Sequence, residues 1–425
     1  MKTSFIPDSM QAAAIEACID TSNLPAKRIV AVTGEAGTGK TRIMQLVHDA
    51  LTDAGYRVAL CAPTGKAARR IRESTDRVAH TIHMLLEYTK PGEPDPKTGK
   101  VTGISVPQRY RGNPVQYDYV LADEYAMVNE ELHRNIIDAL PTGGKLRVFG
   151  DINQLPPIEE NKRLQNEPSP FKQLLNKFTG VTLNVNHRQD EGSGIAAAGR
   201  NILLGRIPKR ADDFVLEFSE RPVDKLGQLV MQAMESNADY SSLDCQVITT
   251  MFKTWVGTYK LNGYLQTLFN RGTGDWFQLP RHPWATDAPV RVRVGDKVIN
   301  TRNLYDLDCF NGETGIIREI TEYEELIIDF GDRVITFPPV LVCSTDNGVK
   351  ELDPRRCLDL AYALTTHKCQ GSEYNEVAYI LNKSTSYMQC RSNLYTAVTR
   401  GRNKTTVITD QVSLSRSIQR KELMR

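Results

Sequence analysis

The sequence predicts an α/β fold in which parallel sheets flanked by helices carry a hairpin insertion and a small antiparallel barrel. Apolar runs of strand length recur, and each ends at a polar or glycine-containing turn that leads into a helical pattern. A segment rich in proline, glycine and basic residues breaks this alternation, and a later block of short β-branched runs breaks it again. Because 425 residues are too many for one simple core, we expect more than one domain.

The first elements alternate as a doubly wound sheet requires. Residues 8–22 predict a helix, because Asp8 is a suitable N-cap and good helix formers follow it. The apolar run 28–33 predicts a strand, and the next helix is expected to begin at about Thr41. Ligands of such sheets bind at the carboxyl ends of the strands. Further buried parallel strands are predicted at Val58–Ala62, Tyr119–Ala122, Leu146–Phe149 and Val247–Thr250.

Two stretches interrupt this alternation. Lys90 to Pro114 predicts an insertion, with a hairpin tip at Lys97–Thr102. From about Val290 to Asp353, short β-branched runs predict an antiparallel barrel with strands at 290–294, 297–300, 315–318, 325–329 and 333–337. The α/β pattern then resumes at 378–381 and 406–409, and the last fifteen residues predict a polar helix or a frayed tail.

Composition indicates a globular protein that does not cross a membrane. Apolar residues make up 40% and charged residues 24%, no apolar run is long enough to span a bilayer, and the N-terminus lacks the apolar core of a signal peptide. Eight cysteines without a C-x-x-C pair predict reduced thiols, a reducing (cytoplasmic) location and no structural zinc.

The net charge of +2 does not by itself indicate a nucleic-acid partner. Basic residues nevertheless gather at Lys66 to Arg77, at Arg109 and Arg111, and from Arg391 to Lys404. Phosphate contacts depend on local potential, so such clusters can line a nucleic-acid groove on a nearly neutral protein. They can equally be solvated helix faces, and charge alone does not separate the two interpretations.

The segment Gly34-Glu-Ala-Gly-Thr-Gly-Lys-Thr41, directly after the strand at 28–33, fits the phosphate-loop pattern G-x-x-x-x-G-K-[ST]. Backbone N–H groups at the start of the following helix would point at an anion. Lys40 would reach the β- and γ-phosphates, and the Thr41 hydroxyl would hold Mg²⁺. We therefore expect this loop to bind a nucleoside triphosphate through Gly34, Glu35, Ala36, Gly37, Thr38, Gly39, Lys40 and Thr41.

Two further strand ends carry polar side chains suited to hydrolysis. Asp123 and Glu124 end the strand at 119–122, where an Asp can hold Mg²⁺ and a neighbouring carboxylate can deprotonate the attacking water. We assign Asp123 to the metal and Glu124 to the water, although an acidic pair at a strand exit can also serve solubility alone. Gln154 follows the strand at 146–149, and its amide can sense a γ-phosphate by donating to phosphate and accepting from water.

Together these motifs, in this order, resemble superfamily 1 helicases and, within them, the RecD/Dda-like class that moves 5′→3′ on DNA. The resemblance covers residues 7 to 405. In the first half it rests on Gly34–Thr41, Ala62–Ala68, Thr81–His83, Asp123-Glu124 and Gly150–Pro157. In the second half it rests on Asn186–Gln189, Gly257 with Leu261-Asn262 and Gln266, Phe310–Gly315, Ala361–Glu373 and Tyr395–Arg400.

The resemblance implies two RecA-like phosphate-loop domains with ATP bound between them. It also implies a pin insertion that splits the duplex and an SH3-like barrel that touches the translocating strand. The implied domains are 1A at residues 1–88 and 115–190, the 1B pin at 89–114, 2A at 191–289 and 354–425, and the SH3-like 2B at 290–353.

Residues from both halves would serve ATP. By resemblance, Arg188 and Arg400 are arginine fingers that stabilise the charge of the transferring phosphoryl group. Gln11 matches the residue that reads the adenine edge, although outside the family context it would be taken for a surface glutamine. Gly371 and Glu373 match the nucleotide-contacting motif of the second domain. The implied catalytic set is Lys40, Asp123, Glu124, Gln154, Arg188 and Arg400, with Thr41 and Asp123 at the metal.

The resemblance also implies single-stranded DNA as the track. No segment resembles a base-reading helix, so sequence-independent contacts with phosphates are expected. The two histidines of the matching set can instead be structural, and Tyr88, Tyr110 and Tyr117 remain equal candidates for the aromatic wedge of the pin. The residues that match the strand-binding motifs are Pro63, Thr64, Thr81, His83, Asn311, Thr365 and His367.

One departure concerns Ala126, where relatives usually place a serine that helps couple the ATP site to its surroundings. The leading hypothesis is a monomeric, DNA-dependent ATPase that unwinds single-strand/double-strand junctions, without membrane association and with single-strand-binding or replication proteins as partners. Two alternatives remain: a translocase that displaces proteins without sustained unwinding, and a non-enzymatic clamp switched by ATP. RNA as the track is also left open, since phosphate contacts scarcely distinguish it from DNA.

Overall fold

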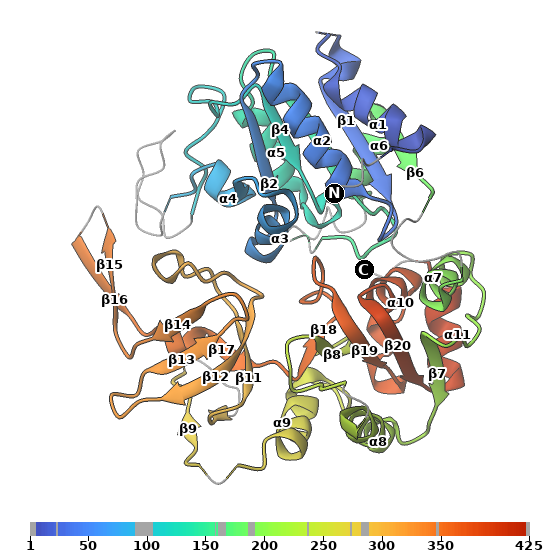
Figure 1. Cartoon of the computed structure of the whole chain (residues 1–425), viewed down its shortest axis with the longest axis vertical. Helices are drawn as coiled ribbons and strands as arrows, with labels where there is room; N and C mark the ends of the chain where they lie inside the picture. The colour runs from blue at the N-terminus through green and yellow to red at the C-terminus, as the bar shows by residue number, and fades with distance from the viewer. Residues whose placement is uncertain are drawn as a thin grey trace. The chain divides into compact units, whose positions relative to one another are not determined.

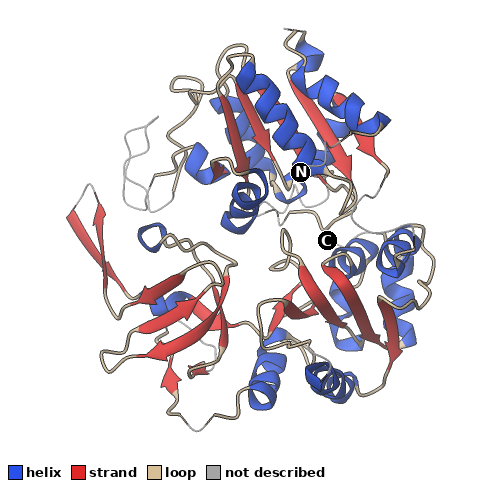
Figure 2. Cartoon of the chain, viewed as in Figure 1, coloured by secondary structure: helices blue, strands red, loops and turns tan. Residues whose placement is uncertain are grey.

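The computed structural model divides the chain into two compact units, residues 1–191 and 192–424 (Figure 1). It describes residues 6–22, 24–89, 105–157, 159, 167–185, 192–235, 238–272, 274–281, 289–345 and 348–421. Each unit contains a parallel sheet flanked by helices, as the sequence predicts (Figure 2). Within the described residues, no helix is long and apolar enough to cross a membrane.

The first unit is built on a six-stranded parallel sheet in the order β3-β2-β4-β5-β1-β6. The strands predicted at 58–62 and 119–122 are β2 (Val58–Ala62) and β4 (Tyr119–Ala122). The other four strands are β1 (Ile29–Gly34), β3 (Ala79–Thr81), β5 (Lys145–Gly150) and β6 (Thr179–Leu183). Because all strands run the same way, β1, β4 and β5 end at one edge, and this brings the phosphate loop, the acidic pair and Gln154 together.

Helices cover both faces of this sheet. Alternate residues of β1 enter opposite cores: Val30 and Val32 pack with helices α1 to α3, whereas Ile29 and Ala31 pack with α5 and α6. The predicted helix at 8–22 is α1, and its N-cap is Asp8, as expected. The helices are α1 (Ser9–Ile19), α2 (Lys40–Asp53), α3 (Gly65–Thr75), α4 (Ile82–Leu85), α5 (Glu130–Ala139) and α6 (Pro170–Lys177), with short 3₁₀ turns η1 (Pro25–Lys27) and η2 (Tyr125–Met127).

A fully buried arginine ties α1 to the start of the sheet. The Arg147 guanidinium, on β5, donates to the carbonyl oxygens of Cys18 at 2.7 Å, Lys27 at 3.1 Å and Asp20 at 3.2 Å. It also lies 5.2 Å from the centre of the Tyr119 ring. These carbonyls belong to the last turn of α1 and to the segment between α1 and β1, so one side chain fixes the connection that leads to the phosphate loop.

The second unit has a five-stranded parallel sheet in the order β18-β8-β19-β20-β7. The predicted strands at 247–250, 378–381 and 406–409 are β8 (Cys245–Thr249), β19 (Tyr374–Ile380) and β20 (Gly401–Thr409). β7 (Phe214–Phe218) and β18 (Ala363–Thr365) complete it. Its helices are α7 (Gly194–Leu203), α8 (Pro222–Glu235), α9 (Thr258–Phe269), α10 (Arg391–Val398) and α11 (Gln411–Gln419), with 3₁₀ turns η4 (Tyr305–Leu307), η5 (Pro354–Cys357) and η6 (Lys383–Met388).

An antiparallel five-stranded sheet, β14-β13-β12-β11-β17, shares a hydrophobic core with the parallel sheet of this unit. Four of the predicted barrel strands correspond to β11 (Lys297–Asn300), β12 (Thr314–Ile320), β13 (Leu326–Asp329) and β14 (Val334–Phe337). The fifth sheet strand is β17 (Leu358–Leu360), beyond the segment predicted as the barrel, whereas the run at 290–294 contains β10 (Arg291–Val292), which pairs with β9 (Phe277–Gln278). The SH3-like character of this sheet remains a prediction.

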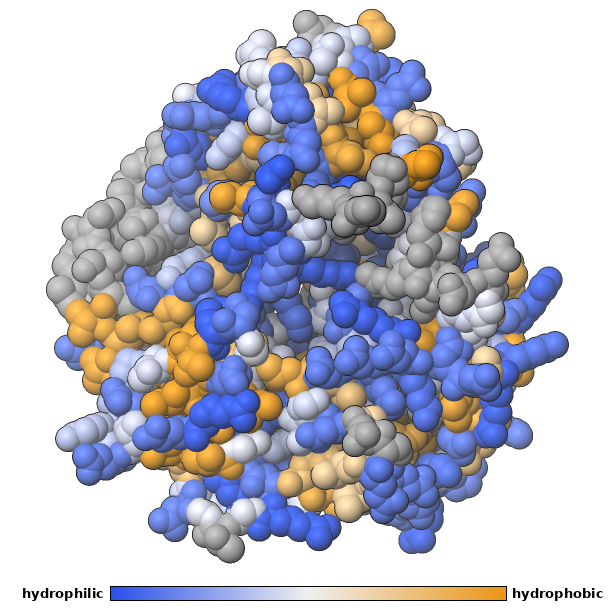
Figure 3. All heavy atoms as spheres, viewed as in Figure 1, coloured by the Kyte–Doolittle hydropathy of each residue, from blue (hydrophilic) through white to orange (hydrophobic). Residues whose placement is uncertain are grey.

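A two-stranded ribbon of β15 (Leu341–Thr345) and β16 (Gly348–Leu352) follows β14. Apolar residues gather over this region on the face drawn in Figure 3. Val334, Val340 and Val342, in and next to these strands, are exposed. The predicted hairpin tip at 97–102 lies outside the described residues. The C-terminal segment forms helix α11, which buries Leu414 and Ile418, so it is not a wholly polar helix.

Replacing Arg147 tests its structural role. We expect Arg147→Met to lower the free energy of unfolding by about 2 to 4 kcal/mol, because several buried carbonyl groups lose a charged donor while side-chain volume is retained. The control is Arg134→Met on α5, whose side chain is 65% exposed and should matter little. Urea unfolding measures both, and equal effects of the two substitutions would contradict this role.

Candidate nucleotide site and nucleic-acid surface

The phosphate loop connects β1 to α2, and its backbone requires glycine at two positions. Gly37 and Gly39 have φ angles of 89° and 83°, in the left-handed region that favours glycine. Gly39 is the N-cap of α2, and a Cβ atom there would lie 2.7 Å from the Gln11 amide nitrogen. The loop therefore leads directly into the N-terminus of a fourteen-residue helix. At this end of a helix, backbone N–H groups and the helix dipole favour an anion.

Lys40 is the first residue of α2, and its ammonium group turns back over the loop. Its Nζ donates to the carbonyl oxygens of Gly34 at 2.7 Å and Glu35 at 2.9 Å. The positive charge is thereby held beside the loop by neutral acceptors. An ammonium in this position can exchange a carbonyl for a phosphate oxygen without a large change of position.

Asp123 follows β4 and faces the start of α2. The Thr41 hydroxyl donates to Asp123 Oδ2 at 3.4 Å, so the two predicted metal-binding groups lie side by side. The Asp123 side chain is nearly buried. Burial, and then the charge of Glu124, raise its pKa to about 6, while Lys40 acts in the opposite direction. A cation at this point would relieve both effects, so the oxygens of Thr41 and Asp123 fit Mg²⁺.

Glu124 adopts a left-handed backbone conformation, with φ 50° and ψ 38°. Its N–H donates to Asp123 Oδ1 at 2.8 Å, which fixes the orientation of the neighbouring carboxylate. A non-glycine residue in this region of backbone space is uncommon and is often found at functional sites.

Gln154 lies after β5 in a turn anchored to β1. The Ile152 N–H donates to the Thr33 hydroxyl at 3.2 Å, and the Gln154 N–H donates to the Asp151 carbonyl at 3.2 Å. The Gln154 side chain is buried, and its carbonyl oxygen Oε1 has no hydrogen-bond partner among the described residues. A buried acceptor without a partner is energetically unfavourable and indicates a missing donor such as water.

Gln11 links α1 to the phosphate loop. Its amide nitrogen donates to the Thr38 carbonyl at 3.1 Å, and its Oε1 accepts from the Asp8 N–H at 3.1 Å in a capping box. The side chain is buried, unlike an ordinary surface glutamine. Its amide is thus engaged within the first unit, and its role in reading adenine remains a prediction.

Sequence reasoning did not identify the support beneath the acidic pair. The Tyr125 hydroxyl is 2.9 Å from His133 Nδ1 on α5, which holds the turn that follows Glu124. Burial lowers the pKa of His133 to about 4. Ala126, at the position where a serine is usual, packs close to the end of β5, since a Cβ on Gly150 would lie 3.2 Å from its nitrogen. In the sequence, Tyr125 directly follows the two carboxylates, and nothing in that pattern indicates that it pairs with His133, eight residues later.

The predicted nucleotide residues of the second half occupy one end of the parallel sheet of the second unit. The buried Arg400 guanidinium donates to the carbonyls of Thr396 and Ser372 at 3.0 and 3.1 Å, and no ion pair to it is found among the described residues. The Glu373 carboxylate accepts from Arg402 Nε at 3.0 Å, and Gly371 has a φ of 72°. Arg188 lies outside the described residues.

Of the predicted strand-binding residues in the first unit, two begin helices. Thr64 and Thr81 are the N-caps of α3 and α4, and their hydroxyls accept from the N–H groups of Ala67 at 3.2 Å and Met84 at 3.1 Å. Pro63 is half-buried beside Thr64. His83 packs against the Tyr88 ring at 4.7 Å, and burial lowers its pKa, which agrees with its structural alternative.

In the second unit, Thr365 ends β18 and accepts weakly from the Lys368 N–H at 3.4 Å. His367 is half-buried in the following turn, and Asn311 is exposed, with its N–H donating to the Asn303 side chain at 2.9 Å. The structure thus leaves Asn311 accessible, whereas the hydroxyls of Thr64 and Thr81 serve as helix caps.

The three tyrosines considered for the pin differ in their packing. Tyr88 and Tyr117 pack against the hydrophobic core of the first unit, and the Tyr88 hydroxyl accepts from Asn135 Nδ2 at 2.8 Å. Tyr110 lies in a turn, where it pairs with Asn113 through two backbone hydrogen bonds. Residues 90–104 of the insertion lie outside the described residues. Of the three tyrosines, Tyr110 is the one that does not pack against that core.

Comparisons with known proteins agree with this geometry. Residues 16–160 match the family described as AAA domain, and residues 360–408 match the UvrD-like helicase C-terminal domain. The ATP-dependent RecD2 DNA helicase of Deinococcus radiodurans is 31% identical over 384 residues, which cover 90% of this chain and 47% of that protein. The RecBCD enzyme subunit RecD of Mycobacterium tuberculosis H37Rv is 28% identical over 436 residues, covering 92% and 68%.

The chain is thus similar, over about nine tenths of its length, to RecD-like DNA helicases. It spans about half the length of the RecD2 relative. Among solved structures, the Pif1 helicase of Bacteroides in complex with ADP-AlF3 and single-stranded DNA has a TM-score of 0.59 at 20% identity, covering 95% of this chain and 92% of that one. Pif1 helicase of Candida albicans has a TM-score of 0.54 at 17% identity, covering 95% and 94%. These structures share the fold of this chain.

The low pKa of His133, which supports the turn after Asp123 and Glu124, predicts that the free energy of unfolding falls in acid. The unfolded chain takes up a proton near pH 6.5 but the folded chain only near pH 4, so stability is complete above 6.5 and is lost as pH falls toward 4. We expect His133→Gln to remove up to about 3 kcal/mol of this pH dependence. Urea unfolding of both proteins at neutral and mildly acidic pH measures it. An identical loss in the variant would contradict the assignment.

Proposed function

We propose that this chain is an ATP-dependent motor that moves 5′→3′ along single-stranded DNA and separates duplex DNA. The observation that carries the proposal is the convergence of three strand ends in the first unit. There the loop lysine, the Thr41–Asp123 pair, Glu124 and Gln154 lie at one sheet edge. Within the part of the chain that the structure describes, the buried Gln154 side-chain oxygen has no hydrogen-bond partner. The similarity to RecD-like helicases supports the same activity.

Each residue has a defined part in hydrolysis. Backbone N–H groups of residues 34–41 and the Lys40 ammonium bind the triphosphate, and Thr41 and Asp123 hold the metal ion. Bound Mg²⁺ would neutralise charge on the β- and γ-phosphates. Glu124 accepts a proton from the attacking water, and Gln154 orients that water through its carbonyl oxygen.

Further nucleotide contacts are proposed from the family motifs. Arg188 and Arg400 act as arginine fingers, an effect worth about 10³ to 10⁵ in rate in other enzymes. The absence of a carboxylate partner for Arg400 among the described residues supports this role, because its charge is not already neutralised. Gln11 contacts adenine, and Gly371 and Glu373 contact the nucleotide.

The track is single-stranded DNA, held without sequence recognition by Pro63, Thr64, Thr81, His83, Asn311, Thr365 and His367. Exposed Asn311 and half-buried Pro63, Thr365 and His367 support contacts with the strand. The motor acts as a monomer at single-strand/double-strand junctions, and replication or single-strand-binding proteins are its partners. Residues 89–114 serve as the pin, and the SH3-like domain at 290–353 contacts the strand. The pin is inserted in the first RecA-like domain, which comprises residues 1–88 and 115–190. The SH3-like domain is inserted in the second, which comprises residues 191–289 and 354–425.

A strand-displacement assay tests the proposal. With ATP and Mg²⁺, we expect release of the labelled strand from a 5′-tailed duplex and not from a matched 3′-tailed duplex. Glu124→Gln should lower DNA-stimulated ATP turnover by roughly 10²- to 10⁴-fold, because the general base is lost while the side chain keeps its size.

Three outcomes would contradict parts of this account. Unwinding of only the 3′-tailed substrate would refute the polarity. Hydrolysis that displaces bound proteins but separates neither duplex would favour the translocase without sustained unwinding. Full turnover by Glu124→Gln would refute the hydrolytic assignment and favour an ATP-switched clamp. A parallel RNA-tailed substrate distinguishes the two kinds of track.

A further inference from the structure

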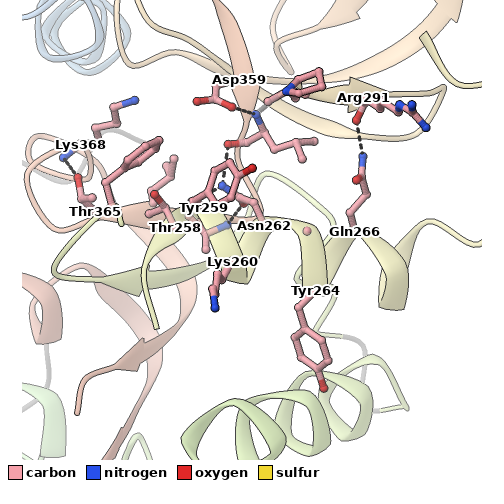
Figure 4. A pocket seen from close by; sticks show the side chains of 17 residues that line it. Thr258, Tyr259, Lys260, Asn262, Tyr264, Gln266, Arg291, Asp359, Thr365 and Lys368 are labelled. Atoms are coloured by element: carbon pink, nitrogen blue, oxygen red, sulfur yellow. Dashed lines mark hydrogen bonds between the residues drawn. The ribbon is translucent and has the colours of Figure 1, made fainter. Parts of the chain in front are cut away.

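We propose that the turn between β8 and α9, together with the first residues of α9, forms an aromatic platform on which bases of the single strand stack. The platform consists of Phe252, Trp255, Tyr259 and Lys260. It lies at a cavity of about 490 Å³ in the second unit, lined among others by Phe252, Tyr259, Lys260 and Thr365 (Figure 4). The proposal rests on the proposed function, since it supplies a contact for the same DNA strand.

The backbone of the turn is tightly fixed. The Thr249 hydroxyl donates to the Val256 carbonyl at 2.7 Å, and the Thr258 N–H donates to the Met251 carbonyl at 3.1 Å. A Cβ on Gly257 would lie 2.3 Å from the Phe252 carbonyl oxygen, so only glycine allows this close approach. A turn held in this way presents its side chains with little loss of conformational entropy on binding.

The aromatic side chains of this rigid turn face solvent. Trp255 is 64% exposed, Tyr259 43% and Phe252 37%. Val256, between Trp255 and Tyr259, and Leu261, which follows them, are buried in the core of the unit. These two buried residues already anchor the turn in the core, so the fold of the turn does not require the exposed rings. The rings of Phe252 and Tyr259 are 6.2 Å apart.

The charges around these rings complement a phosphate backbone. The Lys260 ammonium lies 4.3 Å from the centre of the Trp255 ring, a cation–π contact that leaves both groups on the surface. Lys368 and Arg291 line the cavity. Asp359 is the one carboxylate among the lining residues, and it is paired with Arg281 at 3.9 Å. Positive charge beside exposed rings is the combination that non-specific single-strand binders use.

The cavity wall also includes a residue from the strand-binding motifs. Thr365, at the end of β18, also lines the cavity, and Lys368 lies close to it (Figure 4). Asn262 fixes this wall to α9, because its amide nitrogen donates to the carbonyls of Leu360 and Ala363 at 3.0 and 3.1 Å. A strand whose phosphate contacts Thr365 would thus have its neighbouring base beside the aromatic rings.

A base is a better occupant than an apolar protein segment because the rings are flanked by cations. Every base has a π-face, so stacking adds affinity without reading sequence, in agreement with the lack of a base-reading helix. The phosphate contacts position the strand, and the platform supplies a part of the affinity that does not depend on charge.

The test compares oligo(dT) with an abasic oligonucleotide of equal length, which keeps the phosphates and lacks the bases. Fluorescence anisotropy should show that Trp255→Ala weakens oligo(dT) binding about 5- to 100-fold and scarcely alters binding of the abasic strand. The matched control is Trp276→Ala. That tryptophan is also exposed, and Arg293 lies 4.1 Å from its ring centre. Arg293 does not line the cavity, whereas Lys260, the cation beside Trp255, does, so both affinities should be unchanged in this control.

Tryptophan fluorescence gives a direct second measurement. The chain has three tryptophans, so replacing Trp276 and Trp284 by phenylalanine leaves Trp255 as the sole reporter, and oligo(dT) should quench it. Unchanged oligo(dT) affinity in Trp255→Ala, or equal weakening for both strands, would overturn the platform even if the wild type binds and unwinds DNA. Failure of the wild-type protein to bind single strands at all would instead refute the proposed function.

Discussion

The placement of the Lys40 ammonium over the loop between β1 and α2 is the interaction on which the rest of the site depends. Two carbonyl groups hold that charge at the start of α2, directly beside Thr41 and Asp123. The parallel sheet makes this possible, because it delivers β1, β4 and β5 to a single edge. Reversal of any one strand would carry its functional residues to the opposite edge, away from the loop.

Electrostatics in the first unit favour a bound cation. Burial and the charge of Glu124 make the ionised form of Asp123 unfavourable, whereas the charge of Lys40 favours it. The site therefore stores unfavourable interactions that a metal–triphosphate complex would relieve. In the second unit, buried Arg400 and the exposed rings of the platform are likewise more than the fold requires. Both units therefore carry charged groups or exposed apolar surface that can contact a bound polyanion.

Much of the fold could be predicted from sequence, because strand-length apolar runs and their turns are local signals. The runs at 58–62 and 119–122 correspond residue for residue to β2 and β4. Contacts distant in sequence gave no such signal. Arg147 reaching the chain after α1, His133 supporting Tyr125, and β17 joining the antiparallel sheet from outside the predicted barrel all depend on tertiary packing. The platform was also missed, since Trp255 and Tyr259 carry no recognisable spacing.

Calorimetric titration with Mg²⁺ and a non-hydrolysable ATP analogue tests most directly whether the β1–α2 loop is the nucleotide site. The account predicts one molecule bound per chain and at least about tenfold weaker binding by Lys40→Ala, because a charged hydrogen bond to phosphate is lost. Arg42→Ala is a charge-matched control. Arg42 lies two residues after Lys40 on α2 and its side chain is exposed, so this variant should bind normally. Equal affinity of wild type and Lys40→Ala would contradict the account.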